Sequence, residues 1–261
     1  SYAFSSSAVS RQIKGMVSGT TNVAGIYYKD LKGLLLPVPP LAEQQRIVAF
    51  LDDAFAGIAT AKAHAERNLQ NARALFESHL SAVFTQRGEG WVEERLGDVA
   101  TLQRGMDLPS KDRISGSFPL VSSSGVTDTH YEGPVRGPGV VTGRSGSIGN
   151  VFYIENDFWP LNTVLYVKEF HGNCPRYVYY LLRHFDLKRF ATGTGVPTLN
   201  RNFVHNEKVP VPPLSEQERI VALLDVLKEE TQRLESIYQR KIAALDELKQ
   251  SLLHEAFSMD N

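Results

Sequence analysis

The sequence predicts an α+β fold in which a mixed, turn-rich β domain is joined to two long, antiparallel coiled-coil helices. Three observations predict it. First, a 17-residue stretch occurs twice, at residues 36–52 and 209–225, with 13 of 17 positions identical. Second, each copy leads into a long segment almost free of glycine and proline. Third, the stretch between these segments is rich in Gly and Ser and carries short apolar runs typical of strands.

Composition limits the class of protein. The chain has 261 residues, enough for two domains, and is 42% hydrophobic with a formal net charge of −1, so no global positive field attracts nucleic acid. The single cysteine, Cys174, excludes an internal disulfide framework and a cysteine-cluster zinc site, which indicates a cytoplasmic protein. We find no uninterrupted apolar run of about 18 residues that would span a membrane, and no signal-peptide pattern.

Residues 1–41 resemble the end of a later unit. The segment Arg11-Gln-Ile-Lys-Gly-Met-Val-Ser-Gly-Thr-Thr is similar to Phe185-Asp-Leu-Lys-Arg-Phe-Ala-Thr-Gly-Thr-Gly. We therefore expect residues 1–41 to be the C-terminal remnant of a first unit that is complete only in its second occurrence. The alternative is a short N-terminal arm.

Two long helices are expected at residues 42–88 and 214–261. Pro39-Pro40 and Pro212-Pro213 hold each approach extended. Ser215 with Glu218 three residues later predicts a capping box at the second helix, whereas Ala42 stands at the equivalent place in the first. At about 1.5 Å per residue, each helix is on the order of 60 Å long.

Apolar residues in the second helix alternate at spacings of four and three, which predicts a coiled-coil seam. The first helix has small residues at the equivalent positions, so we expect small side chains of one helix to pack against large side chains of the other. The residues predicted to pack between the helices are Ala61, Ala65, Ala72, Leu75, Leu234, Tyr238, Leu245, Leu248 and Leu252. The alternatives are a plain core helix or a partner-binding helix.

Residues 89–213 are expected to form the β domain. Strands are predicted at residues 139–142, 150–154 and 163–167, between glycine-rich turns. A short helical turn leading into a strand is predicted at residues 96–104, and a helix at residues 175–190.

Motifs for catalysis are absent from the sequence. Gly143-Arg-Ser-Gly-Ser-Ile-Gly149 contains three glycines but lacks the G-x-x-x-x-G-K-[ST] pattern of a P-loop. We find neither a glycine-rich S-adenosylmethionine loop nor the Asn/Asp-Pro-Pro-aromatic motif of amino-group methylation, and the histidines show no metal spacing.

The remaining polar residues of the β domain suit DNA recognition. Arginine can pair bidentately with guanine, and serine and threonine can bond bases or phosphates. Ordinary solvated arginines on surface loops are the alternative. The candidate DNA-binding residues are Arg104, Lys111, Arg113, Ser122, Ser123, Ser124, Arg136, Thr142, Arg144, Ser145 and Ser147.

Several motifs together resemble one family, the DNA-specificity (S) subunits of type I restriction-modification enzymes. The repeated Pro-Val-Pro-Pro-Leu-x-Glu-Gln-x-Arg-Ile-Val segments resemble the family's entry into each long helix. Trp91-Val-Glu-Glu-Arg-Leu-Gly-Asp-Val resembles the start of a target-recognition domain. Gly143-Arg-Ser-Gly-Ser-Ile-Gly149, Phe158-Trp-Pro-Leu-Asn162 and Gly193-Thr-Gly-Val-Pro-Thr-Leu-Asn200 resemble its internal motifs.

The resemblance implies two target-recognition domains separated by two antiparallel helices, with each domain reading half of a bipartite site in double-stranded DNA. The helices would fix the spacer and dock two methyltransferase subunits, to which restriction subunits are added. S-adenosylmethionine, ATP and Mg are expected on these partners, and the chain itself would be non-catalytic. Only residues 1–41 would represent the first recognition domain, residues 89–213 would be the second, and the fragment could form a homodimer.

Two further readings stay open. The chain could be the recognition segment of a type IIB or IIG restriction-methylation enzyme, joined covalently to a catalytic part. It could instead be a coiled-coil scaffold whose β domain binds protein rather than DNA. An enzyme is the third and poorest interpretation.

Overall fold

The computed structural model describes residues 2–17, 25–36, 38–193, 195 and 197–257. Parts of four sequence features lie outside the described residues: residues 18–21 of the early echo, Pro37 of the first repeat copy, Thr194 and Val196 of the motif that begins at Gly193, and residues 258–261 of the predicted second helix. The predicted α+β class is confirmed.

The chain divides into two compact units. One consists of Ser1–Ala74 with Glu230–Asn261, and the other is Leu75–Glu229. We call them the N-terminal unit and the reader unit. The long helices α3 (Leu41–Thr85) and α7 (Leu214–Phe257) each contribute to both units.

Helix α3 begins one residue before its predicted position, and α7 begins at the predicted residue, Leu214. The Pro40 carbonyl accepts from the Gln44 amide at 3.0 Å, and the Pro213 carbonyl accepts from the Gln217 amide at 3.0 Å. The last proline of each repeat copy therefore supplies the first helical acceptor. Because Ser215 then lies inside the first turn, the predicted capping box is wrong.

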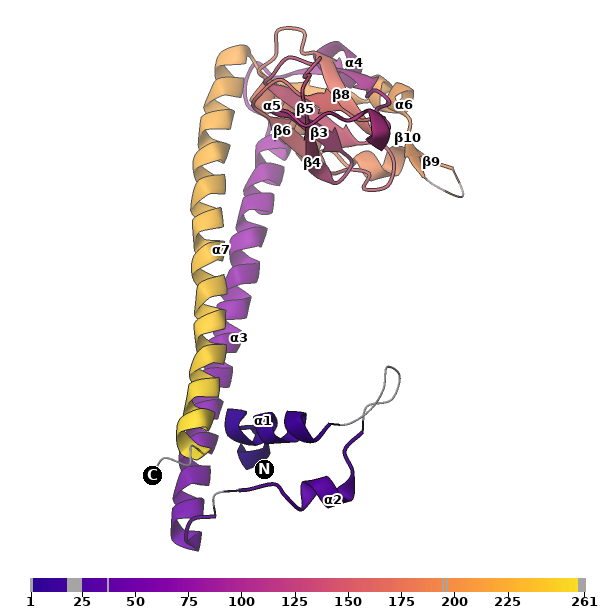
Figure 1. The fold of residues 1–261 in the computed structure, drawn as a ribbon. Helices are drawn as coiled ribbons and strands as arrows, with labels where there is room; N and C mark the ends of the chain where they lie inside the picture. Colours follow the sequence, from indigo (N-terminus) through magenta and orange to yellow (C-terminus); the bar gives the residue numbers. More distant parts are fainter. Residues whose placement is uncertain (1, 18–24, 37, 194, 196, 258–261) are drawn as a thin grey trace. The chain divides into compact units, whose positions relative to one another are not determined.

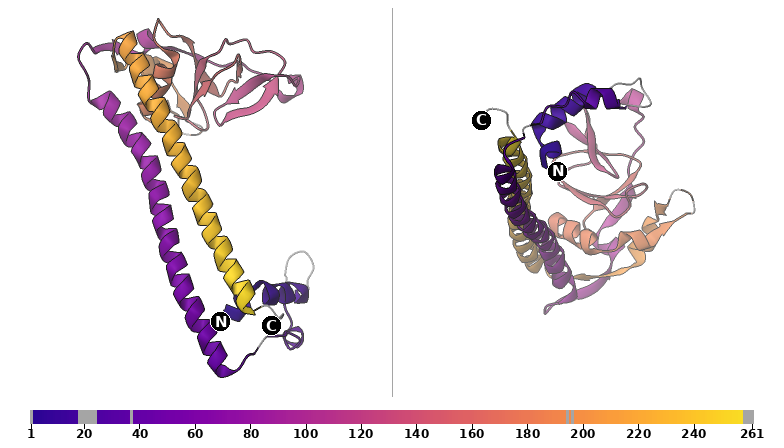
Figure 2. Two further views of the ribbon diagram at one scale, coloured as in Figure 1. Left: turned by 90° about the vertical axis from the view of Figure 1, so that its left-hand side faces the viewer. Right: turned by 90° about the horizontal axis from the view of Figure 1, so that it is seen from below.

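The helices run antiparallel, as predicted (Figures 1 and 2). Within the N-terminal unit, Lys62 Nζ lies 2.7 Å from Asp246 Oδ1, and Arg73 Nε lies 2.9 Å from Glu235 Oε2. Residue numbers rise along one helix as they fall along the other, so the two pairs fix both direction and register.

The packing seam differs from the prediction in places. Ala65 and Ala72 are buried and Ala61 is half-buried, but Leu75 is 43% exposed and Phe76 is buried in its place. An α-helix drifts by about 20° per heptad against a 3.5-residue repeat, and beyond Ala72 burial follows a spacing of four residues. On α7, Tyr238, Leu245 and Leu252 are half-buried, whereas Leu234 and Leu248 are 37% and 47% exposed.

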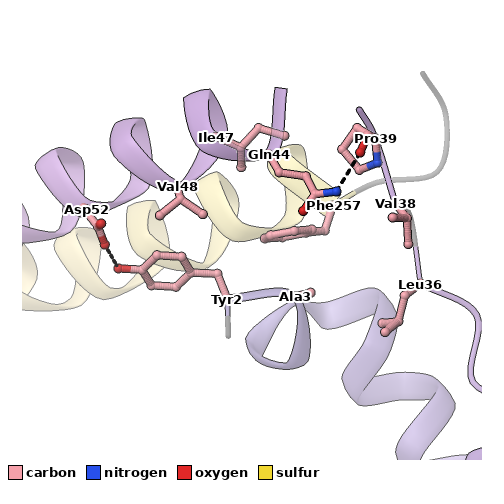
Figure 3. A pocket seen from close by; sticks show the side chains of 10 residues that line it. All are labelled: Tyr2, Ala3, Leu36, Val38, Pro39, Gln44, Ile47, Val48, Asp52 and Phe257. Atoms are coloured by element: carbon pink, nitrogen blue, oxygen red, sulfur yellow. Dashed lines mark hydrogen bonds between the residues drawn. The ribbon is translucent and has the colours of Figure 1, made fainter. Parts of the chain in front are cut away.

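The N-terminal unit adds short elements to its helix pair: η1 (Tyr2–Ser5), α1 (Ser7–Met16) and α2 (Tyr28–Leu31). The Tyr2 hydroxyl donates to the Asp52 carboxylate, and its ring meets Phe55 edge-on at 5.2 Å. Figure 3 shows the hollow beside Tyr2, of about 520 Å³ and lined mainly by apolar side chains.

The reader unit contains four small sheets. The strands are β1 (Val92–Arg95), β2 (Thr101–Arg104), β3 (Phe118–Ser122), β4 (Gly125–His130), β5 (Gly139–Gly143), β6 (Val151–Ile154), β7 (Trp159–Pro160), β8 (Val164–Glu169), β9 (Ala191–Thr192), β10 (Thr198–Leu199) and β11 (Lys208–Val211). The sheet orders are β2-β8-β5-β6, β4-β3-β7, β1-β11 and β9-β10. All strand pairs are antiparallel except β3 with β7, which matches the prediction of a mainly antiparallel domain.

Short helices complete this unit: α4 (Leu96–Val99), η2 (Ser110–Asp112), α5 (Pro175–His184), η3 (Leu187–Phe190) and α6 (Arg201–Asn206). The predicted helix over residues 175–190 is therefore interrupted after His184. Buried residues of α5 share one core with strands β5 and β8 and with Phe76 of α3 and Leu224 of α7. Helix α5 thus joins the four-stranded sheet to the helix ends of its own unit.

Candidate nucleic-acid interface

Three arginines from distant parts of the sequence line one hollow of about 370 Å³ in the reader unit. Arg104 ends β2, Arg144 follows β5, and Arg201 begins α6. We call this set the arginine hollow. The other lining residues are Leu165, Thr192, Thr198, Leu199, Asn200 and Asn202.

The loop after β5 places Arg144. The Arg144 amide donates to the Thr163 carbonyl at 2.8 Å, and the Arg144 carbonyl accepts from the Leu199 amide at 2.8 Å. The backbone of Arg144 is therefore held between Thr163, which precedes β8, and Leu199 of β10, and this fixes where its half-buried side chain begins.

Gly143 makes this loop possible. A Cβ added there would lie 2.0 Å from the Ser147 carbonyl oxygen, far inside contact distance. Gly146 and Gly149 have φ values of 79° and 86°, in the region where glycine is favoured. The glycines noted in the sequence thus fold a tight turn beside Arg144.

The arginines are only lightly neutralised. Arg104 Nη2 lies 3.6 Å from Asp107 Oδ2, a long and exposed pair. Arg144 Nη1 donates to the Asn162 carbonyl oxygen at 3.4 Å, which leaves the remaining guanidinium donors for another acceptor. Converging cations of this kind attract anionic or strongly accepting groups.

Asn200 positions Arg201. Its side-chain oxygen accepts from the Asn202 amide at 3.0 Å and so caps α6. Arg201 is exposed at the first position of that helix and contributes, after burial, to the lowered pKa of His205.

Three of the predicted serines form a turn close to this loop. Ser122 Oγ lies 2.8 Å from Ser124 Oγ, and the Ser123 amide donates to Thr163 Oγ1 at 3.3 Å. A Cβ added at Gly146 would be 3.3 Å from Ser123 Oγ, so the turn and the loop are neighbours. Ser145 pairs with Thr198 of β10, and Ser147 is exposed.

Thr142 is a correction to the predicted set. It is fully buried on β5, and its hydroxyl has no hydrogen-bond partner among the described residues. All five residues of β5 are buried, so the threonine faces the interior rather than a ligand.

The structure separates the other predicted cations from the arginine hollow, since none of them lines it. Arg136 is paired at 2.7 Å with Asp157, whose pKa is lowered by a backbone N–H bond from Gly137 and by Arg136. Lys111 is exposed on η2, and Arg113 Nε donates to the Leu108 carbonyl at 3.3 Å.

Sequence reasoning missed Arg201, Asn200 and Asn202. The signal was present, because the quoted motif beginning at Gly193 ends at Asn200 and runs directly into an arginine and a second asparagine. Arginine and asparagine side chains are among those that contact phosphates and base edges in DNA.

Among the described residues, no group of three or more His, Cys, Asp or Glu side chains could hold a metal ion. In the same part of the chain, no helix is long and apolar enough to cross a membrane.

The described geometry has clear relatives. A family model for the type I restriction modification DNA specificity domain matches residues 88–242. The chain is 28% identical over 139 residues to a putative type I restriction enzyme specificity subunit of Haemophilus influenzae, covering 51% of this chain and 36% of that protein. It is 23% identical over 291 residues to the EcoBI specificity subunit of Escherichia coli, covering 92% of this chain and 61% of that protein. The chain thus spans less than two thirds of the length of each of these relatives.

Solved structures share the fold. A chain of a type I R-M system structure has a TM-score of 0.85 at 21% identity, covering 100% of this chain and 70% of that one. The HsdS subunit of Thermoanaerobacter tengcongensis has a TM-score of 0.64 at 22% identity, covering 100% of this chain and 69% of that one. Because the family model matches more than half of the sequence, the chain belongs to the type I restriction modification DNA specificity family.

Proposed function

We propose that the reader unit binds double-stranded DNA and reads one half of a bipartite site, with the arginine hollow at the centre of the contact surface. The observation that carries this proposal is the convergence of Arg104, Arg144 and Arg201 within the region that the family model matches. Guanidinium groups bond phosphates and pair bidentately with guanine, and the nearby asparagines suit adenine.

Salt dependence tests this proposal. Affinity for duplex DNA falls with salt at a slope of roughly −0.9 per neutralised phosphate. Arg201→Ala should reduce the slope by about one unit if Arg201 contacts a phosphate. Arg144→Ala should cost roughly 1–3 kcal/mol for one base identity if Arg144 reads an edge.

Arg136→Ala is the matched control, because Arg136 is 90% exposed but lies outside the hollow and is paired with Asp157. It should leave both slope and sequence preference unchanged. If all three variants bind DNA as the parent does, the arginine hollow is not the interface.

We infer that the long helices dock methyltransferase subunits, two per complex, with restriction subunits joining them. Within the N-terminal unit, α7 exposes Leu234, Ile237 and Leu248 at spacings that place them on one face. Within the reader unit it exposes Leu223 and Val226. Apolar helix faces of this kind are typical of protein interfaces. S-adenosylmethionine, ATP and Mg belong on these partners, and the chain itself is non-catalytic in this proposal.

Co-purification tests the docking. Ile237→Asp should abolish retention of a cognate methyltransferase subunit, whereas Gln232→Asp, at an exposed polar position of the same helix, should not. We further infer that the chain can pair as a homodimer, which light scattering of the isolated chain tests. A monomer at high concentration would refute that homodimer.

A further inference from the structure

The repeated stretch ends in an aspartate in both copies, Asp52 and Asp225. Each carboxylate accepts a hydrogen bond from a tyrosine hydroxyl: Tyr2 donates to Asp52, and Tyr180 donates to Asp225. The tyrosines do not occupy equivalent repeat positions, since Ser7 is the equivalent of Tyr180. The same joint between a long helix and the segment preceding it is therefore built twice from different chain positions.

In the reader unit, Asp225 of α7 is bound by two side chains of α5, Tyr180 and Arg176. Arg176 Nε donates to Asp225 Oδ1 at 3.0 Å, and its guanidinium lies 4.5 Å from the centre of the Tyr153 ring. Tyr180 is fully buried, and burial together with Asp225 raises the pKa of its hydroxyl. The phenol therefore stays protonated and remains a donor to the carboxylate.

A second contact of α5 reaches the other long helix. Arg183 Nη2 lies 2.5 Å from Glu77 Oε1 of α3, and its guanidinium stacks 4.8 Å from the Phe76 ring centre. Helix α5 thus forms one ion pair with α7, through Arg176, and one with α3, through Arg183. Its apolar residues Val178 and Leu181 belong to the core shared with the four-stranded sheet.

We propose that Asp225 and Glu77 are positioning residues, which hold the sheet carrying the arginine hollow at one fixed orientation on the helix ends of its own unit. Directional, charge-assisted hydrogen bonds to both long helices oppose rotation of the sheet about α5. An apolar contact alone opposes such rotation poorly, because hydrophobic attraction has no preferred direction. The consequence for DNA rests on the proposed function, since a fixed orientation would present a half-site at one angle. The mechanical role does not depend on DNA.

Pulsed electron paramagnetic resonance on the full chain tests the joint. Nitroxides at Lys168→Cys on β8 of the four-stranded sheet and Ala222→Cys on α7, in a Cys174→Ser background, are both at exposed positions of the reader unit. The parent should give a narrow distance distribution. Asp225→Asn combined with Glu77→Gln should at least double its width. The joint is refuted if the distribution stays as narrow as in the parent.

Glu216→Gln is the matched control, because it breaks the exposed pair with Arg219 on α7 without touching α5. It should leave the width unchanged, and equal broadening by this variant would contradict the proposal. Tryptophan emission must match the parent to show that the joint variant is folded. If Asp225→Asn does not fold, Glu77→Gln alone decides, since Glu77 is 57% exposed and its loss should still broaden the distribution.

Duplex binding separates this inference from the proposed function. The Asp225→Asn, Glu77→Gln double variant should bind a half-site duplex with an affinity within about twofold of the parent's, because the arginine hollow is intact. A parent that binds no duplex would refute DNA reading, while the distance distributions would still decide the mechanical role.

Discussion

Replacing Thr142 by valine should stabilise the reader unit. The Thr142 side chain is fully buried, and its hydroxyl lacks a hydrogen-bond partner among the described residues. In protein mutational data, burying such a hydroxyl costs roughly 1–3 kcal/mol. Valine keeps the branched shape that strands favour and removes the polar atom. We therefore expect the free energy of unfolding to rise by about 1–2 kcal/mol.

Thr163→Val is the matched control. The Thr163 hydroxyl accepts from the Ser123 amide at 3.3 Å, so its loss leaves that N–H unpaired. This variant should lose about 1 kcal/mol. The same chemical change is thus expected to have opposite signs at two nearby threonines.

Urea unfolding followed by tryptophan emission measures both variants. Trp91 and Trp159 are the two tryptophans of the chain, and both lie in the reader unit, so the signal reports that unit. A loss of stability in Thr142→Val would show that its hydroxyl is paired. A loss of DNA affinity in the same variant would indicate that Thr142 contacts DNA after all.

Three further tests address the helix packing, the ionisation of a half-buried histidine and the loop beside Arg144. Phe76→Ala should cost about 3–5 kcal/mol because Phe76 is buried, whereas Leu75→Ala at an exposed position should cost far less, and equal losses in urea melts would refute the seam. The His205 ring accepts a hydrogen bond from the Leu102 backbone N–H at 2.8 Å, and burial lowers the pKa of His205. The neutral ring is therefore favoured in the folded state. Its contribution to the free energy of unfolding should be complete above about pH 6.5 and should be lost as the pH falls below that value. His205→Gln, which keeps an acceptor but does not titrate, should flatten the pH dependence of the urea midpoint, and an unchanged pH dependence would exclude His205 as its source. Gly143→Ala should weaken DNA binding because the added methyl group displaces the loop, and unaltered binding would show that the loop tolerates the methyl group. Gly57→Ala, with open space around it, should raise the free energy of unfolding by about 0.5–1 kcal/mol.

The sequence was most informative where local rules decide the structure. The starts of the long helices were predicted within one residue because prolines precede them, and their length followed from Gly57 being the only glycine inside the first. The limits of β5 and β6 were equally clear, since glycine-rich turns border them.

Non-local packing set the limit of sequence reasoning. Nothing in the local sequence shows that Arg201 of α6 lines the same hollow as Arg144. Their placement depends on the hydrogen bond from the Leu199 amide to the Arg144 carbonyl, which links distant parts of the chain. Thr142 next to a glycine resembles a turn residue, and its burial follows from layers packed on both faces of β5. The choice of Phe76 over Leu75 depends on helix drift that a strict heptad does not contain.

Selection from a random duplex library measures the central claim most directly. The chain, mixed with a cognate methyltransferase subunit, should enrich a fixed short sequence. The Arg144→Ala, Arg201→Ala double variant should lose part of that sequence and bind with a shallower salt dependence. Enrichment of the same sequence at the same strength and salt slope by both proteins would contradict the assignment of the arginine hollow as the DNA-reading surface.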